Sequence, residues 1–477
     1  MLRKEFEIMY SEHSNNNGVG TKLYSFINEL FPICRSITGN GTRKTLELIK
    51  QHIPLEIMEI PTGTKVFDWT VPKEWNIRDA YIKNSKGEKI IDFQKSNLHI
   101  LQYSIPIHKK ISIDELKNHL FTIEELPDYI PYKTSYYQEN WGFCLSYNDF
   151  LKLQDDEYEV FIDSTLENGS LSYGELLLEG EQTDEILFST YVCHPSMCND
   201  NLTGISILTF LAKSLKNKKL KNSYRFLFIP ETIGAITWLS INENNVGKIK
   251  GGLVATCLGD SGCLTYKKSR MENSIIDYAV EKVLEDSKSE YNLLNFFPTG
   301  SDERQFCSIG FNLPIGSLMR TIYGKFSEYH TSADNLEFIN SQSLANSFNM
   351  YSNVVDVLEN NQTYINVNPK CESNLRNKIQ IGSFKKYSNV VDVLENNQTY
   401  INVNPKCEPN LGKRGLYNLI GASKNSKQMN EPFLWILNQS DGNNSLLDIS
   451  IKSNISFSKI IDAAKILYEH NLIKLKN

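Results

Sequence analysis

Between about residue 178 and residue 360, short apolar runs alternate with stretches of helical periodicity, and this alternation restricts the possible folds more than any other feature. Runs such as "EILFSTYV" and "YRFLFIP" have the length and composition of buried strands. "GISILTFLAKSL" and "SIIDYAVEKVLEDS" repeat apolar residues at the spacing of a helix face. The pattern predicts an α/β fold with a largely parallel sheet.

The chain before this region shows a different pattern of apolar residues. Residues 21–54 show helical periodicity that is broken at "TGNG", which predicts two helices. From Gly63 to about Leu177, short aromatic and β-branched runs are separated by turn formers, and "NSKGEK" is typical of a hairpin loop. We therefore expect residues 63–177 to be a β-rich domain inserted into an α/β domain made of residues 1–62 and 178–360.

A near-identical duplication follows the α/β region. Residues 347–375 recur as residues 383–411, a shift of 36 positions with three differences. The differing pairs are Asn349 and Lys385, Met350 and Lys386, and Ser373 and Pro409. Two copies are too few for a solenoid. We expect 347–411 to act as a connector in which one copy packs natively and the other is an insertion.

Residues 412–477 have the rhythm of a winged helix. "SLLDISIKSNISFSKIIDAAKIL" predicts a helix-turn-helix, and "NLIKLKN" predicts the strand of the wing. The second helix of this motif offers only Lys459 and Lys465 as basic residues. The pattern therefore favours a packing or dimerisation module over a nucleic-acid-binding one, and a second copy of the chain is an open alternative as partner.

Composition excludes several classes of protein. The formal net charge of −6 argues against a globally basic nucleic-acid binder. No apolar run approaches the roughly 18–20 residues needed to cross a bilayer, and the N-terminus lacks the apolar core of a signal peptide. Nine cysteines at irregular spacing are typical of reduced thiols. We expect a cytoplasmic protein without a membrane partner.

Polar side chains that could carry chemistry follow the predicted strands. His194 and Asp200 stand between the strand "EILFST" and the next helix, and imidazole and carboxylate groups are suitable zinc ligands. The neighbouring Cys193 and Cys198 lack a second pair at zinc-finger spacing. Each residue also has a structural interpretation: a histidine satisfied in the core, or an aspartate that caps a helix.

Glu231 ends the strand "YRFLFIP" and precedes a helix. At the mouth of a sheet, a carboxylate beside a metal can act as a general base, and at the first turn of a helix it can simply favour the helix dipole. Later, "SDERQF" places Asp302, Glu303 and Arg304 together, either as substrate contacts or as a solvated corner of ion pairs.

His330 lies in "FSEYHTSADN", four positions before Asp334. The carboxylate of Asp334 could orient the imidazole of His330, or it could cap the next helix. Only eight histidines occur in the chain. The combination of His, Asp, Glu and His at four predicted strand ends is much more specific than any one of them.

These segments resemble the sequence blocks of the M28-like zinc aminopeptidases. The likeness rests on "CHPSMCNDNLTG", "PETIG", "SDERQF" and "YHTSADN", and extends to "FPICRSITGNG" and "GTKVFDWTVPKEWNIRDAYI". The closest branch has an inserted β domain and a C-terminal winged helix. The resemblance implies a three-layer α/β/α sandwich, with His194, Asp200 and His330 as metal ligands and Glu231 as the general base.

The sequence also departs from that family pattern. Thr232 stands where the family has a second Glu as metal ligand, and Ser196 stands where it has an Asp that orients the first His. A further ligand Asp falls in "VATCLGDSG", where Asp260 is the only carboxylate. The resemblance therefore implies one zinc per chain rather than two, since three protein ligands and a water complete a catalytic site.

The expected function is zinc-dependent hydrolysis of amide bonds, most simply removal of the N-terminal residue of a short peptide. Asp302, Glu303 and Arg304 are expected to contact the substrate, and Tyr329 or Tyr323 to donate to the oxyanion. Asp334 and Asp260 are expected to support the ligands. Two alternatives stay open: deacylation of a small N-acyl compound such as an amino sugar, and a non-catalytic binding or regulatory role carried by the winged helix.

Overall fold

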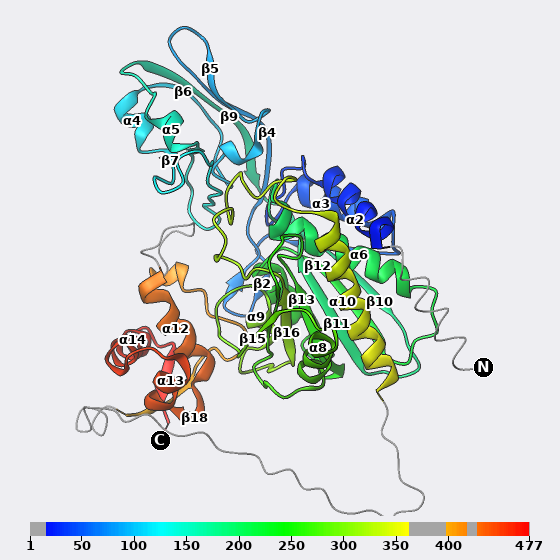
Figure 1. Ribbon diagram of the computed structural model, residues 1–477. Helices are drawn as coiled ribbons and strands as arrows, with labels where there is room; N and C mark the ends of the chain where they lie inside the picture. Colours follow the sequence, from blue (N-terminus) through cyan, green and yellow to red (C-terminus); the bar gives the residue numbers. More distant parts are fainter. Residues whose placement is uncertain (1–15, 362–396, 417–426, 477) are drawn as a thin grey trace, which may run out of the picture.

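The computed structural model describes residues 16–361, 397–416 and 427–476, and an eight-stranded mixed sheet forms its centre (Figure 1). In spatial order the strands are β1 (Glu56–Pro61), β10 (Ser170–Leu178), β12 (Ser223–Ile229), β11 (Glu185–Tyr191), β13 (Ile249–Ala255), β16 (Ile315–Met319), β14 (Leu264–Lys267) and β15 (Tyr291–Leu294). The four strands β12, β11, β13 and β16 pair in parallel, as the alternating pattern predicts. All seven residues of β11 are buried, which explains its uninterrupted apolar run.

Helices cover both faces of this sheet. One face carries α2 (Asn16–Leu30), α3 (Asn40–Lys50), α6 (Thr203–Leu215), α8 (Ile275–Asp286) and α10 (Ser341–Asn360), and the other carries α7 (Ile233–Asn242) and α9 (Glu303–Phe306). Adjacent residues of β11 divide between the two cores, Phe188 on the first face and Leu187 on the second. The three-layer α/β/α prediction is confirmed. No helix among the described residues has the length and apolar character of a membrane span.

The inserted domain projects from one end of the α/β layers (Figure 1). Its antiparallel sheet has the order β5 (Lys89–Asp92), β4 (Glu74–Lys83), β9 (Glu157–Glu167) and β6 (Ile107–Ser112). Smaller elements are β2 (Lys65–Val66), β3 (Trp69–Thr70), α4 (Ile113–Lys117), β7 (Leu120–Phe121), β8 (Phe143–Cys144) and α5 (Tyr147–Phe150). The expected end of the insertion at residue 177 differs from the structure, because β10 pairs with β1 and β12 in the large sheet.

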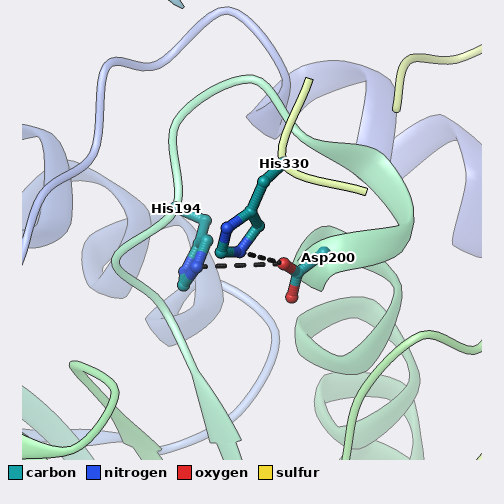
Figure 2. A group of neighbouring side chains, drawn as sticks. All are labelled: His194, Asp200 and His330. Carbon is teal, nitrogen blue, oxygen red and sulfur yellow. Dashed lines mark ion pairs between the residues drawn. The ribbon is translucent and has the colours of Figure 1, made fainter. Parts of the chain in front are cut away.

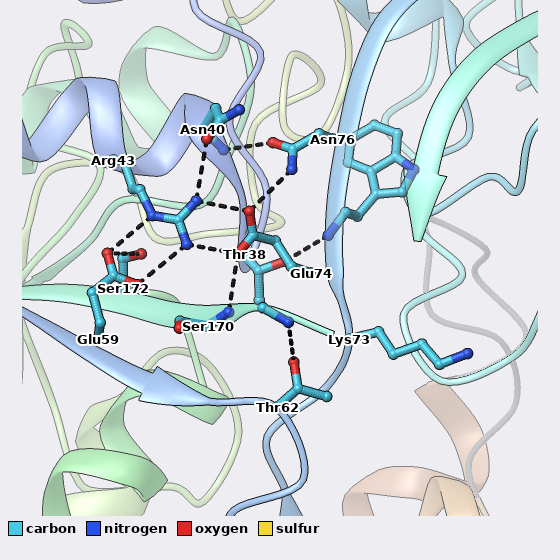
Figure 3. A network of polar contacts seen from close by, with 12 residues as sticks. Thr38, Asn40, Arg43, Glu59, Thr62, Lys73, Glu74, Asn76, Ser170 and Ser172 are labelled. Carbon is cyan, nitrogen blue, oxygen red and sulfur yellow. Dashed lines mark hydrogen bonds and ion pairs between the residues drawn. The ribbon is translucent and has the colours of Figure 1, made fainter. Parts of the chain in front are cut away.

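A charged network joins the insertion to the α/β domain (Figure 3). Arg43 of α3 donates to Glu59 of β1 at 2.9 Å and to Glu74 of β4 at 2.6 Å. Glu74 also accepts a hydrogen bond from the Ser170 amide at 2.9 Å, where β10 begins. One guanidinium therefore holds together a helix of the α/β domain, an edge strand of the large sheet and the first long strand of the insertion.

The C-terminal domain is a winged helix, and its described residues form three strands and three α-helices. It contains β17 (Thr399–Asn402), α12 (Lys427–Gln439), β18 (Asp441–Ser445), α13 (Leu446–Ser453), α14 (Phe457–Glu469) and β19 (Ile473–Leu475), with the sheet order β18-β17-β19. The expected start at residue 412 is too late, since β17 lies at the centre of this sheet. The strand was missed because it falls inside the duplicated segment.

The two copies of the duplicated segment contribute different halves. Residues 347–361 of the first copy continue α10 and bury Tyr351 and Val354 against the sheet. Residues 397–411 of the second copy supply β17 and the stretch that ends at the buried Leu411. The rest of the duplication, residues 362–396, lies outside the described residues. The expectation that one whole copy packs natively therefore stays a prediction, because part of each copy lies outside the described residues.

Candidate active site

The predicted chemistry-bearing residues gather at the carboxyl ends of the parallel strands. His194 follows β11, Glu231 follows β12, and His330 lies in the connection between β16 and α10. Asp200 stands in the irregular turn Cys198–Leu202 that leads into α6. Because neighbouring parallel strands end at the same edge of a sheet, four segments distant in sequence meet at one place.

Three of these side chains form a compact cluster (Figure 2). His330 Nε2 lies 2.9 Å from Asp200 Oδ2, and His194 Nε2 lies 3.8 Å from the same oxygen. One ligand atom from each of the three lies within 4.8 Å of the others, and among the described residues no other group of His, Cys, Asp or Glu has this character. The three residues predicted as metal ligands are therefore brought together.

Asp200 is fully buried and is held from two sides. The hydroxyl of Tyr191, at the end of β11, donates to Asp200 Oδ1 and lies 2.6 Å from the hydroxyl of Thr256. The carboxylate of Asp334 accepts from the backbone amide of Asp200 at 2.9 Å. Asp334 thus supports the loop of Asp200, whereas the sequence placed it beside the imidazole of His330.

The backbone around His194 is fixed by a buried cation. Arg35, which has no exposed surface, donates through Nε to the His194 carbonyl oxygen at 2.8 Å. The sulfur of Cys193 lies 3.3 Å from His194 Nδ1. Ser196 instead donates to the Phe31 carbonyl oxygen at 2.7 Å. The thiol of Cys193 therefore occupies the position from which a carboxylate usually orients a metal-binding histidine.

Aromatic rings surround His330. Tyr329 stacks on its imidazole with ring centroids 3.9 Å apart, and Tyr132 of the inserted domain meets it edge-on at 5.2 Å. The Tyr132 amide donates to the His330 carbonyl oxygen at 2.8 Å. The insertion therefore takes part in the site itself. Tyr329 packs against a ligand, and its expected contact with substrate stays a prediction.

Glu231 faces the cluster while part of it remains accessible. Its Oε2 lies 3.8 Å from His194 Nε2, and 27% of the side chain is exposed. The backbone amide of Glu231 donates to Cys193 Sγ at 3.3 Å. Burial raises the pKa of the Glu231 carboxyl well above its ordinary value, and the carboxylates of Asp302 and Asp200 raise it further.

Burial also sets the protonation of the ligands. It lowers the pKa of His194 to about 4, so the imidazole is neutral at pH 7. Burial acting alone would raise the pKa of Asp200, but the imidazoles of His194 and His330 outweigh it and lower this pKa. A neutral imidazole and an ionised carboxylate are the protonation states that bind a divalent cation.

The segment "SDER" lies beside the site, and each of its three charged side chains has different partners. Asp302 is fully buried and accepts from the Thr232 amide at 2.6 Å, and burial raises its pKa to about 7. Glu303 is fully buried and pairs with Lys267 at 2.6 Å. Arg304 donates to the Thr232 hydroxyl at 3.0 Å. The side chains of Asp302 and Glu303 have no exposed surface and are engaged within the chain, and the contact with substrate expected for Asp302, Glu303 and Arg304 stays a prediction.

Two further expected residues lie outside the cluster. Asp260 accepts from the Thr321 hydroxyl at 2.6 Å and from the Gly262 amide at 2.7 Å, and its second oxygen accepts from the side-chain amide of Asn199, the neighbour of Asp200, at 3.0 Å. Its expected role in supporting the ligands therefore stays a prediction. The hydroxyl of Tyr323 donates to Glu303 at 3.2 Å and to the Thr299 carbonyl oxygen at 3.3 Å. That hydroxyl is already engaged, which argues against its expected role at an oxyanion.

Sequence reasoning missed four residues that shape the site: Tyr132, Tyr191, Cys193 and Arg35. Arg35 stands within the quoted motif "FPICRSITGNG", but no local pattern shows that it reaches His194. Tyr191 ends a strand, where an aromatic residue is ordinary. The contact of Tyr132 joins segments from two domains, so no periodicity reveals it.

The side chains of the cluster fit a divalent metal. Asp200 Oδ2 and His330 Nε2 are buried, and neither finds a well-oriented hydrogen-bond partner in the described chain. Buried polar atoms are rarely left in this state without a ligand. Two imidazoles and a carboxylate form a donor set that suits zinc, and Glu231 stands beside it.

Comparison with solved structures agrees with this geometry. A crystal structure described as a "putative peptidase" from Clostridium acetobutylicum is 52% identical, covers 98% of this chain and 100% of its own, and has a TM-score of 0.73. A zinc aminopeptidase from Bacillus subtilis has a TM-score of 0.52 at 11% identity over 70% of this chain and 94% of its own. A peptidase M28 precursor from Shewanella amazonensis has a TM-score of 0.51 at 11% identity over 74% and 97%. The fold is therefore that of the M28 aminopeptidases.

The chain belongs to the family described as a domain of unknown function (DUF4910), whose model matches residues 24–361. A winged helix-turn-helix model matches residues 398–475. A relative from Clostridium acetobutylicum is 54% identical over 461 residues, which cover 97% of this chain and 98% of the relative. It is named "Putative polysaccharide biosynthesis protein with aminopeptidase-like domain".

Proposed function

We propose that the protein is a metal-dependent hydrolase of amide bonds. The single observation that carries this proposal is the cluster of His194, Asp200 and His330 with Glu231 beside it, 3.8 Å from His194. The combination pairs a ligand set with a partly exposed carboxylate at the end of a parallel sheet, where α/β enzymes bind their substrates.

His194, Asp200 and His330 would hold one zinc ion. Among the described residues no second group of ligands has this geometry, and Thr232 stands where the family pattern has a second metal-binding Glu. When bound, zinc supplies Lewis-acid activation of a water molecule and of the scissile carbonyl. Burial keeps the His194 imidazole neutral, and the hydrogen bonds from His330 and Tyr191 help to lower the pKa of the Asp200 carboxyl.

Glu231 is the residue placed to move the proton. Its partly exposed carboxylate can take a proton from the attacking water and pass it to the leaving amine. The surroundings that raise its pKa bring it nearer to the pH at which it must both accept and release that proton. Tyr191 and Asp334 hold Asp200, and Arg35 holds the backbone of His194.

The substrate class is best described as a short peptide with a free amino terminus. The fold supports this choice, because it is shared with zinc aminopeptidases. A second candidate is a small N-acyl compound such as an N-acyl amino sugar, which the word "polysaccharide" in the name of the relative favours. An aminopeptidase requires a free α-amine and a deacylase does not, so paired substrates with free and acetylated amines distinguish the two.

The test combines metal content with turnover. We expect about one zinc per chain in the purified protein and hydrolysis of either aminoacyl anilides or N-acetylglucosamine. Glu231→Gln should keep the metal and lose turnover, whereas His330→Ala should lose metal affinity. The matched controls are Glu243→Gln, at the opposite end of α7 from Glu231, and His108→Ala, whose side chain is largely exposed. A protein that takes up no zinc on titration would instead support a non-catalytic role.

A further inference from the structure

The general base sits at the start of a strained turn. Thr232, the residue after Glu231, has φ 63° and ψ −72°, and the Ile233 amide donates to the Glu231 carbonyl oxygen at 2.8 Å. These values describe the rare form of γ-turn, whose conformation is unfavourable for a β-branched residue. Such a turn persists only when its surroundings hold it in place.

The amide and the hydroxyl of Thr232 are held from outside the turn. Its amide donates to Asp302 Oδ1 at 2.6 Å, and its hydroxyl accepts from Arg304 Nη2 at 3.0 Å. The opposite nitrogen of Arg304, Nη1, lies 3.1 Å from Glu408 Oε2. We call Asp302, Arg304 and Glu408 the Thr232 clamp.

Glu408 comes from the C-terminal part of the chain, within the residues matched by the winged helix-turn-helix model. Its backbone is fixed on both sides: its amide donates to the Gln305 side chain at 3.0 Å, and its carbonyl oxygen accepts from Trp69 Nε1 at 2.9 Å. Arg304 and Glu408 are only 15% and 13% exposed, so their attraction is weakly screened. The winged-helix region therefore reaches the residue next to the general base.

We propose that Glu408 and Arg304 are positioning residues, through which the C-terminal domain fixes the direction of the Glu231 carboxylate. The proposal rests on the hydrolase function proposed above for its kinetic arm. The proposal also assigns a role to Thr232, which stands where the family pattern has a metal-binding Glu. The Thr232 hydroxyl binds no metal in this proposal and connects the turn to Arg304. Loss of the clamp should loosen the turn and leave the three metal-binding side chains unchanged.

The first arm of the test needs no activity. Hydrogen exchange of the peptide that contains Thr232 and Ile233 should become about tenfold faster in Glu408→Gln. Lys406→Met is the matched control, because Lys406 lies two residues away and pairs with Glu243 at the end of α7. It should change the exchange less than twofold. In a Thr232→Val background, which lacks the hydroxyl that Arg304 holds, Glu408→Gln should have no additional effect.

The second arm uses the zinc-loaded enzyme. Glu408→Gln should lower kcat about tenfold while KM and the zinc dissociation constant stay within twofold, since the base is misdirected and the ligands are intact. Wild-type exchange in Glu408→Gln, or an equal effect of this change in the Thr232→Val background, would overturn the proposal. If the wild-type protein hydrolyses no amide, the proposed function fails, and the exchange data alone still decide the positioning role.

Discussion

Replacing Lys267 by methionine tests how much the buried ion pair between Lys267 of β14 and Glu303 of α9 stabilises the α/β domain. Lys267 and Glu303 have no exposed surface and their charged atoms lie 2.6 Å apart. Lys267 also donates to the Thr299 carbonyl oxygen at 2.7 Å. In Lys267→Met, Glu303 remains buried with the Tyr323 hydroxyl as its one remaining donor among the described residues. Removing one partner of a buried pair costs about 3–5 kcal/mol, because the other charge is left uncompensated.

The assay is calorimetric unfolding at pH 7. A domain of this size loses about 2–4 °C of Tm per kcal/mol, so Lys267→Met should lower the Tm of the α/β transition by roughly 6 °C or more. The matched control is Lys282→Met, whose pair with Asp286 is 59% and 65% exposed and should leave Tm nearly unchanged, because water screens an exposed ion pair. Lys267→Met combined with Glu303→Met should recover part of the loss, since no charge is left buried. If Lys267→Met lowers Tm no more than the control does, the reasoning is refuted.

Further predictions concern the domain junction and one glycine. The pKa of Glu74 is lowered to about 2, chiefly by hydrogen bonds from Arg43, against an ordinary value of 4.5. Its stabilisation is therefore complete above pH 4.5 and is lost as pH falls towards 2. Glu74→Gln should lower the free energy of unfolding at pH 7 by about 2 kcal/mol, after allowance for screening by water. The difference from wild type in thermal unfolding should shrink between pH 4.5 and 3. A difference that stays constant with pH would contradict this prediction. Gly300 has φ 118°, and a Cβ there would lie 1.9 Å from the Tyr323 hydroxyl. Gly300→Ala should lower the free energy of unfolding by about 1–3 kcal/mol. Gly247→Ala should leave it unchanged, because a Cβ there meets open space. Equal midpoints of urea unfolding for the two variants would contradict this prediction.

The fold was largely predictable because its strands carry their burial in local sequence. β11 is buried along its whole length and appears as a continuous apolar run, and the helices on either face repeat at helical spacing. The same local patterns made three candidate site residues recognisable in the sequence. His194 and Glu231 follow buried strands, and Asp200 precedes a helix. The limits of domains were less predictable: β10 and β17 resemble their neighbours in composition and are placed only by their partners in a sheet.

The support of the site could not be predicted, because it depends on contacts between distant segments. Arg35 meets His194 across 159 positions, and Tyr132 reaches the site from another domain. Asp260 was considered because it is the only carboxylate in its loop, and its contacts with Thr321, Gly262 and Asn199 also join segments that are distant in sequence. The type of a residue suggests what it could do, but its hydrogen-bond partners in the folded chain have to be known before a role can be assigned.

The clamp also has a consequence for the order in which the site is made. Chains emerge from the ribosome from the N-terminus and their domains fold as units, so His194, Asp200, Glu231 and His330 are all synthesised before Glu408. A nascent chain that ends before Glu408 would carry the whole proposed ligand set with an unclamped Glu231. The proposed metal site would therefore be complete before its proposed base is held in place.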